Sequence, residues 1–306
     1  MDYIRQMEIE PGMGADELVR MMEACGFGAR RLAEAVNIYE EMLSGDYARF
    51  FTLAGAMVPA GMRNIVSDLI RDGRIDVLVS TGANLVHDII EAFSHHVLGD
   101  PEASDEDLRD EGISRIYDVY VGDDDFVRFE EILQEILPER GDLMTGTELL
   151  RLLGKRIEDE KSILRSASDA GVPIFCPAIS DSMIGLQAWL YRQTRKLNVD
   201  AFGDVGELVD ICYGAERSGI VIIGGGVPKN FALQSMLVTP KSFDLAIQLT
   251  TDRPEPGGLS GASLSEAVSW GKIAPEARKV TVYGDATINF PLMVASTLTR
   301  LQRRGL

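Results

Sequence analysis

The sequence is poor in the residues that build disulfide frameworks and metal sites. It contains 3 cysteines and 3 histidines in 306 residues, and the cysteines are scattered through apolar segments. We therefore expect buried, reduced thiols and neither a disulfide framework nor a zinc site. His95 and His96 suggest metal binding, but adjacent residues on a helix diverge by about 100°. No acidic or cysteine partner is evident beside them, so no metal site is predicted.

Basic residues are also scarce, because 30 Lys and Arg stand against 48 Asp and Glu, a formal net charge of −18. Nucleic acids and anionic membranes require clustered Lys and Arg, so neither is an expected partner. An acidic protein attracts cations, and polyamines or a basic protein would suit it. The same charge could equally reflect only solubility or a salty cytoplasm.

Long apolar runs are absent as well, since none approaches the roughly 20 residues that span a bilayer. The first residues, MDYIRQMEIEPG, contain no basic segment leading into an apolar core, so we expect no signal peptide. These features predict a soluble cytoplasmic protein.

Short, β-branched apolar runs alternate with helical patterns along most of the chain. After an N-terminal stretch with apolar residues at three- and four-residue spacing, the runs are IDVLVST, IYDVYVG, VPIFCPA, GIVIIGGG, FDLAIQLTT and KVTVYGD. Strands that are apolar on both faces and alternate with helices indicate a parallel sheet covered by helices. We predict an α/β fold, with an N-terminal helical segment over residues 1–47 and one domain over residues 48–306.

Unusual residues follow four of the expected strands, where ligands bind in doubly wound sheets. They occupy residues 80–84, 177–182, 224–230 and 284–287. Glycines 224–226 could cradle a phosphate at the start of a helix or could form only a tight turn. Asp181 and Asp285 could accept hydrogen bonds from ribose hydroxyls or could be helix N-caps.

The segment GGLSGASLSEAVSWGK, residues 257–272, combines a glycine-rich loop with a short helix. Ser263 and Glu266 form a capping-box pattern, and Glu266 and Trp270 share a helical face. Gly271 should end the helix directly before Lys272. An acid, an indole and a lysine could form a cage for an alkylammonium, with the lysine as a nucleophile. A capped surface helix with a buried Trp and a solvated Lys is the alternative.

The run EAVSWGK at residues 266–272 resembles the active-site signature of deoxyhypusine synthases. GGGVPK at 224–229 is similar to the glycine-rich segment of that family. VYGDA at 282–286, followed by FPL, is similar to its last strand and final helix. VLVST at 77–81 and PAISD at 177–181 match in order and spacing. The resemblance extends over roughly residues 48–300, and the NLxHD and PKNF patterns resemble its prokaryotic deoxyhypusine synthase-like branch.

The resemblance implies a Rossmann-like NAD-binding domain and a transferase. Family members oxidise spermidine with NAD and pass its aminobutyl group to a lysine as an imine. They then transfer the group to a lysine on the precursor of translation factor 5A and reduce the product. Lys272 would be the imine-forming lysine, and Glu266 and Trp270 would line the polyamine pocket.

The resemblance also implies a cofactor site and an assembly. The family forms homotetramers in which an N-terminal helix can reach over a neighbouring site. The positions that would hold NAD are Thr81, Gly82, Ala83, Asp181, Gly225, Thr251, Asp252, Asp285 and Ala286.

Several polyamine-binding groups of eukaryotic members are replaced in this chain. Two consecutive acidic residues give way to Val86 and His87, a histidine gives way to Asn230, and aspartates give way to Leu186 and Leu259. His87 and Asn230 are still expected to bind substrate. His87 could be a general base near the amine or only a spacer on a helix face. These departures leave open a homospermidine synthase-like transfer to a small amine such as putrescine, and a non-catalytic NAD-binding protein.

Overall fold

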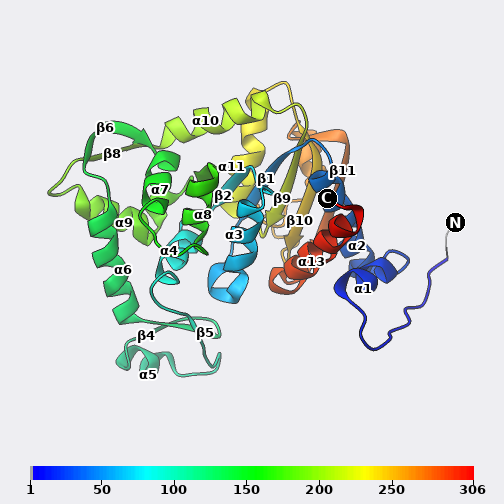
Figure 1. The fold of residues 1–306 in the computed structure, drawn as a ribbon, viewed down its shortest axis with the longest axis horizontal. Helices are drawn as coiled ribbons and strands as arrows, with labels where there is room; N and C mark the ends of the chain where they lie inside the picture. The colour runs from blue at the N-terminus through cyan, green and yellow to red at the C-terminus, as the bar shows by residue number, and fades with distance from the viewer. Residues whose placement is uncertain (1–2) are drawn as a thin grey trace. The chain divides into compact units, whose positions relative to one another are not determined.

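The structure is a computed structural model that describes residues 3–306, and its internal contacts divide the chain into two compact units. Unit 1 contains the chain up to Leu53 and from Glu207 onward, and unit 2 is Ala54–Gly206. The fold is α/β, as predicted, with parallel strands between helices (Figure 1). The expected division at residue 47 stays a prediction.

Unit 1 is built on four parallel strands in the order β11 (Ile273–Tyr283), β10 (Phe243–Thr250), β9 (Ser218–Ile223) and β1 (Ala48–Leu53). Phe50 of β1 pairs with Ile220 of β9, and Ala246 of β10 pairs with Ile220 from the other side. These residues are almost completely buried, which is why the strands appear as continuous apolar runs.

Helices surround these strands and include the expected N-terminal pair, α1 (Ala15–Met22) and α2 (Phe27–Ser44). Helix α2 contacts β10, β11 and α13 (Ala286–Arg304), and α1 contacts α2 and α13. A buried ion pair holds α1 in place, since Arg300 Nε lies 2.6 Å from Asp16 Oδ1. The other helices of unit 1 are α11 (Gly226–Ser235), η3 (Met236–Val238) and α12 (Leu264–Ser269).

Unit 2 contains three small groups of strands. β2 (Val77–Ser80) and β7 (Ile174–Phe175) pair in parallel, as do β6 (Arg140–Thr145) and β8 (Leu197–Asp200). β3 (Val97–Leu98), β5 (Val119–Gly122) and β4 (Ile113–Ile116) form an antiparallel sheet. The run IYDVYVG was expected as a parallel strand, and this was wrong. Tyr117 has a φ of 59°, so the chain turns inside the run and joins β4 to β5 as a hairpin.

The helices of unit 2 carry most of its buried residues. They are η1 (Val58–Met62), α3 (Arg63–Arg71), α4 (Gly82–Ile90), α5 (Asp105–Asp110), α6 (Asp123–Ile136), α7 (Gly146–Gly154), α8 (Ile163–Ala170), η2 (Ile179–Asp181) and α9 (Met183–Tyr191). α10 (Ala201–Gly214) contains the boundary between the units. No helix among the described residues is long and apolar enough to cross a membrane.

All three cysteines are free thiols, which confirms the expectation of no disulfide among them. Cys176 and Cys212 are buried, and burial raises the pKa of each thiol to about 12. Cys25 is half-buried. The two buried thiols are therefore protonated near neutral pH and serve as small apolar side chains.

A buried ion pair joins three helices of unit 2. Arg63 Nε of α3 donates to Asp88 Oδ1 of α4 at 2.6 Å, and both side chains are almost fully buried. Asp88 also accepts hydrogen bonds from Ser162 Oγ and from the first two backbone N–H groups of α8. The carboxylate therefore compensates both the guanidinium and the N-terminal end of a helix dipole.

We predict that Asp88→Asn lowers the free energy of unfolding by about 3 kcal/mol, because it removes the fully buried carboxylate and leaves Arg63 paired only with the half-buried Asp159. Urea unfolding followed by circular dichroism measures the change. Asp169→Asn is the matched control, since Asp169 forms an exposed pair with Arg165 and should lose less than about 1 kcal/mol. Equal effects of the two substitutions would contradict the structural role of Asp88.

Candidate active site

The glycine-rich segment after β9 makes a tight turn into α11. Gly224 and Gly226 have φ values of 71° and 60°, in the left-handed region that favours glycine. A Cβ on Gly225 would lie 2.4 Å from Ser260 Cα, so the neighbouring loop leaves no room for a side chain. The three glycines therefore form a tight turn, and the phosphate-cradle interpretation stays a prediction. The N-terminus of α11 also lacks a side-chain cap, so its free N–H groups could still receive a phosphate.

Lys229, on the first turn of α11, is the buried lysine of unit 1, with 2% of its surface exposed. Its Nζ donates to Gln248 Oε1 at 3.2 Å, to the Leu259 carbonyl at 3.2 Å and to the Ala262 carbonyl at 2.5 Å. Gln248 Nε2 in turn donates to the carbonyls of Gly224 and Ser260. One lysine and one glutamine thus join the glycine turn to the loop that precedes α12.

Burial lowers the pKa of Lys229 to about 8, with Glu266 opposing the change and Lys272 adding to it. Sequence reasoning assigned no role to Lys229 or Gln248. The available signals were a lysine in the first turn of the helix after the glycines and a glutamine inside a largely apolar strand.

Lys272 is held by a helix-terminating motif. Gly271 has a φ of 71°, its N–H donates to the Val268 carbonyl, and the Lys272 N–H donates to the Ala267 carbonyl at 3.0 Å. This is the Schellman arrangement that ends helices at glycine. The Lys272 carbonyl then accepts from the Phe243 N–H at 3.1 Å, and β11 begins at the next residue. The backbone of Lys272 is therefore restrained on both sides.

The residues around Lys272 are more exposed than the sequence suggested. Ser263 caps α12 by accepting from the Glu266 N–H at 3.1 Å, as predicted, but Glu266 itself is exposed. Trp270 is 62% exposed, so the alternative of a buried Trp is wrong. The Lys272 Nζ lies 5.5 Å from the centre of the Trp270 ring, within the range of a cation–π contact. Lys272 is half-buried, and the enclosed lysine is its neighbour Lys229.

The remaining site candidates of unit 1 lie in loops or at helix starts. Thr251 and Asp252 are exposed just after β10. Asp285 is the N-cap of α13, because its Oδ1 accepts from the Thr287 N–H at 2.8 Å. Ala286 follows as the first helical residue, and Asn230 Nδ2 donates to Gln234 Oε1 at 3.1 Å. The N-cap role of Asp285 uses one carboxylate oxygen and leaves the second for another donor.

In unit 2, the start of α4 has the form of a second anion site. Thr81 occupies the N-cap position of α4, but its side chain accepts no hydrogen bond from the helix. Gly82 is buried, and a Cβ at this position would lie 2.4 Å from Ser182 Cβ. Ala83 is exposed. Asn84 Nδ2 donates to Thr81 Oγ1 at 3.0 Å and thereby orients that hydroxyl. Asp181 is exposed at the end of η2, and the N-cap of α9 is Ser182, so the N-cap alternative for Asp181 is wrong by one residue.

Within each unit, these residues have the chemistry that phosphate and ribose groups require. Two helix N-termini without side-chain caps, those of α4 and α11, present backbone N–H groups to anions. Their first residues are glycines that permit close approach. Asp181, Asp252 and Asp285 are exposed carboxylates of the kind that accept ribose hydroxyls.

His87 is buried on α4, and the side chains around it include an acidic partner of the other two histidines. Its Nδ1 lies 2.8 Å from His96 Nε2, and His96 Nδ1 contacts Glu91 Oε1. His95 Nδ1 lies 3.2 Å from Glu91 Oε2. The expectation that the histidine pair lacks an acidic partner was therefore wrong. Within residues 3–306, no group of three or more His, Cys, Asp or Glu has the geometry of a metal site.

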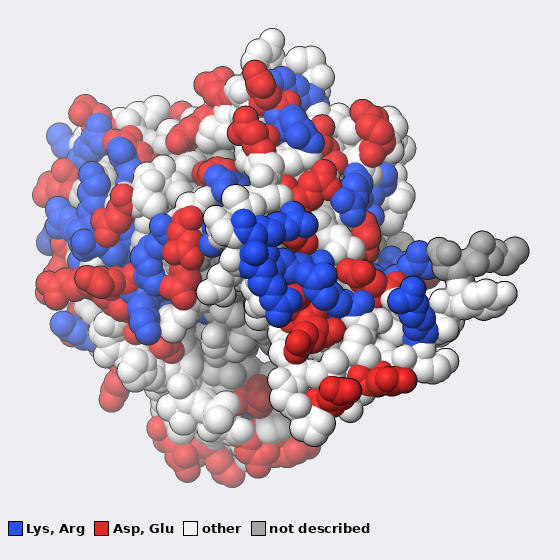
Figure 2. Space-filling model, turned by 45° about the vertical axis from the view of Figure 1, so that its right-hand side comes forward, with Lys and Arg blue, Asp and Glu red and all other residues white. Residues whose placement is uncertain are grey.

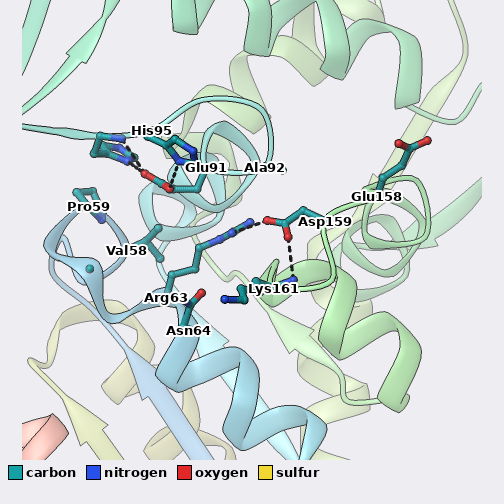
Figure 3. A pocket seen from close by; sticks show the side chains of 12 residues that line it. Val58, Pro59, Arg63, Asn64, Glu91, Ala92, His95, Glu158, Asp159 and Lys161 are labelled. Carbon is teal, nitrogen blue, oxygen red and sulfur yellow. Dashed lines mark hydrogen bonds and ion pairs between the residues drawn. The ribbon is translucent and has the colours of Figure 1, made fainter.

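A cavity of about 700 Å³ lies beside these side chains in unit 2. Figure 3 shows Glu91 and His95 on one side of it, with Arg63, Asp159 and Lys161 on another. Arg63 is fully engaged there, because its NH1 donates to Asp159 Oδ2 at 2.6 Å. Nothing in the sequence groups the other lining residues with the histidines, because the lining comes from three separate segments, residues 58–64, 91–96 and 158–161.

At the four positions that are acidic in eukaryotic members, Val86 and His87 are buried on α4, whereas Leu186 and Leu259 are exposed.

Figure 2 shows Lys and Arg gathered near the middle of one face, with Asp and Glu beside them. In unit 1, several arginines pair with acidic partners rather than standing alone. These ion pairs join Arg20, Arg300, Arg303 and Arg304 to Asp16, Glu23 and Glu40.

Comparison with known proteins decides the family. The family model of deoxyhypusine synthase matches residues 17–297. The chain belongs to the deoxyhypusine synthase family. It is 57% identical to probable deoxyhypusine synthase 1 of Methanosarcina mazei, over 98% of this chain and 96% of that protein. It is 48% identical to probable deoxyhypusine synthase 1 of Archaeoglobus fulgidus, over 96% and 97% of the two chains.

Solved structures agree with the fold. The crystal structure described as a "putative deoxyhypusine synthase" from Entamoeba histolytica matches with a TM-score of 0.71 at 19% identity, over 97% of each chain. The ternary complex of AgrE with ornithine and NAD+ matches with a TM-score of 0.57 at 13% identity, over 90% of this chain and 34% of that one. At such identities the likeness extends to the fold alone.

We predict that Gly271→Ala destabilises the protein by about 1–2 kcal/mol, because alanine is strained at a φ of 71°. Thermal unfolding measures the loss. The control is Gly258→Ala, in the loop before α12, where a Cβ would meet nothing within 4 Å. A Gly271→Ala protein as stable as this control would contradict the Schellman assignment.

Proposed function

We propose that this protein is an NAD-dependent deoxyhypusine synthase that acts in the cytoplasm. It takes the aminobutyl group of spermidine, or of a related polyamine, onto Lys272 and transfers it to a lysine of the translation factor 5A precursor. The observation that carries the proposal is the restrained Lys272 beside Trp270, at the end of a helix that bears Glu266. Family membership supplies the reaction type.

The roles of the chain's own residues follow from their chemistry. The Lys272 amine adds to the oxidised carbon of the polyamine, and the remaining amine leaves, so that the aminobutyl group is held as an imine. The Trp270 ring attracts the terminal ammonium of that group, and Glu266 offers a carboxylate from the same helix. Lys229 donates to two carbonyls of the loop that leads into the helix ending at Lys272, and thereby helps to position that helix.

NAD, when bound, accepts a hydride from the polyamine and later returns it to the product. The family resemblance leads us to assign cofactor-binding roles within each unit separately. In unit 2, Thr81, Gly82 and Ala83 would offer N–H and hydroxyl groups to a phosphate, and Asp181 would accept from a ribose hydroxyl. In unit 1, Gly225 and Thr251 would offer donors to a phosphate, and Asp252 and Asp285, which precedes Ala286, would accept from ribose hydroxyls. The structural support is the uncapped state of α4 and α11.

We further propose that the protein forms homotetramers. Apolar side chains on α9 support subunit contacts, because Leu186, Trp189 and Leu190 are all exposed on this helix. Phe202 at the start of α10 is 86% exposed. Sedimentation equilibrium of the purified chain tests the proposal, and a monomer at micromolar concentration would contradict it.

Borohydride trapping tests the covalent role of Lys272. With NAD and spermidine, the wild-type protein should gain an aminobutyl adduct that peptide mass spectrometry locates on Lys272. Lys272→Arg keeps the positive charge but should lose the adduct completely, because a guanidinium does not form the imine. Lys279→Arg, on β11, is the matched control and should trap as the wild type does. An adduct on any other lysine overturns the assignment.

A transfer assay separates the two candidate acceptors. Labelled spermidine and NAD are supplied with either the factor 5A precursor or putrescine, and we expect label on the precursor protein. Label appearing only in a small amine would instead identify a homospermidine synthase, a reaction compatible with the replaced residues Val86, His87, Leu186 and Leu259. The deoxyhypusine names of the archaeal relatives favour the protein acceptor. No transfer to either acceptor, with NAD bound, refutes both.

A further inference from the structure

Two arginines of unit 1 lie against one tyrosine ring. The guanidinium carbon of Arg253 is 4.2 Å from the centre of the Tyr283 ring, and that of Arg31 is 5.4 Å from it. Arg31 belongs to α2 and Arg253 to the loop after β10, so the ring brings together cations from distant parts of the chain. We call these three residues the arginine–tyrosine cluster.

The cluster lies at the carboxyl end of the parallel strands of unit 1. Tyr283, the last residue of β11, pairs with Thr250, the last residue of β10, and the Gly284 N–H donates to the Thr250 carbonyl at 3.0 Å. The loops that leave the two strands therefore start side by side, and Arg253 lies in the first of them, shortly after Thr250. Ligands of open α/β sheets bind at this end of the strands.

Arg31 is held in position by two contacts. Its NH1 donates to the Thr281 carbonyl of β11 at 3.0 Å, and its guanidinium lies over the shared ring. Two carboxylates of the same helix, Glu34 and Glu41, pair with Arg278 instead, at 2.7 and 2.5 Å. An arginine that is stacked on an aromatic ring keeps N–H groups at its edge for an anionic partner.

Arg253 is held through its backbone. Its carbonyl leaves no room for a Cβ on Gly261, so its loop is packed directly against the segment that leads to α12 and Lys272. The side chains of Arg253 and Arg31 are both exposed, so a ligand can reach them. Within residues 3–306, neither arginine forms an ion pair with a carboxylate.

The chemistry of the cluster suits a phosphate group on a ligand. Two guanidiniums without carboxylate partners concentrate positive charge at one end of a sheet, in a chain whose net charge is −18. Arginine binds phosphate through paired N–H groups, a geometry that lysine lacks. The carboxylates of Asp252 and Asp285, on the same two loops, accept hydrogen bonds from hydroxyl groups. A nucleotide, which carries both phosphates and hydroxyls, satisfies both kinds of residue.

We propose that Arg31 and Arg253 bind a phosphate group of the nicotinamide cofactor, and that Tyr283 orients both guanidiniums for it. This inference rests on the proposed function, which assigns Asp252 and Asp285 at the same strand ends to the cofactor. Two sources supply such a phosphate. One is the pyrophosphate that NAD and NADP share, and the other is the ribose phosphate that NADP alone has.

Calorimetric titration of the full chain with NAD and with NADP, without polyamine, tests the arginine–tyrosine cluster. Arg253→Gln and Arg31→Gln should each raise the Kd at least about 10-fold, because each removes charge-assisted hydrogen bonds to the phosphate. A loss of affinity for NAD identifies the shared pyrophosphate, whereas a loss for NADP alone identifies the ribose phosphate. Wild-type Kd values for both nucleotides in either variant overturn the proposal.

Arg217→Gln is the matched control for both substitutions. The Arg217 guanidinium carbon also lies over a tyrosine, 3.9 Å from the centre of the Tyr47 ring. Arg217 directly precedes β9, at the opposite end of the strands, so its substitution should leave both Kd values unchanged. Equal weakening by Arg217→Gln would reflect the lost net charge alone and would overturn the proposal.

The titration separates this inference from the proposed function. NAD binding that depends on both arginines, without a borohydride-trapped adduct on Lys272, refutes the proposed function and supports the cluster. Normal trapping on Lys272, with NAD affinity that neither substitution changes, supports the proposed function and overturns the cluster. A wild-type chain that binds neither nucleotide overturns both.

Discussion

The site in unit 1 depends on the burial of the Lys229 amine. A lysine removed from water must satisfy its N–H groups, and this one does so on Gln248 and on two carbonyls of the loop before α12. Those contacts fix the loop against the glycine turn, and the loop leads directly into the helix that ends at Lys272. The contacts of one buried amine therefore control the position of the proposed nucleophile.

In unit 2, a buried carboxylate likewise holds several elements together. Asp88 lies at the N-terminus of α8 and beside Arg63, so α3, α4 and α8 meet at one buried carboxylate. Helix α4 is thereby held at its C-terminal half, while its uncapped N-terminus stays available to an anion. His87 directly precedes Asp88, so the restraint on Asp88 also positions the His87 imidazole.

Much of the fold was predictable because parallel strands buried on both faces leave continuous apolar runs, as in β9 and β10. The cap at Ser263 and the stop at Gly271 were predictable because each depends on neighbours within a few residues. The hairpin inside IYDVYVG was missed, since a positive φ at Tyr117 carries no glycine signal. Lys229 was overlooked because its partners lie 19 to 33 residues away along the chain.

Local sequence alone therefore determined the helix end that presents Lys272, the glycine turn at residues 224–226 and the resemblance that points to deoxyhypusine synthesis. Tertiary structure decided which lysine is buried and which carboxylate His95 and His96 contact. The sequence did not suggest that His95 and His96 share the partner Glu91, because the side chains of adjacent residues on a helix point about 100° apart. The chain instead leaves α4 at Ile90, and the irregular segment that follows turns both rings toward one carboxylate. The hydrogen-bond partners of these histidines depend on the path of the chain after α4, which no local sequence pattern specifies.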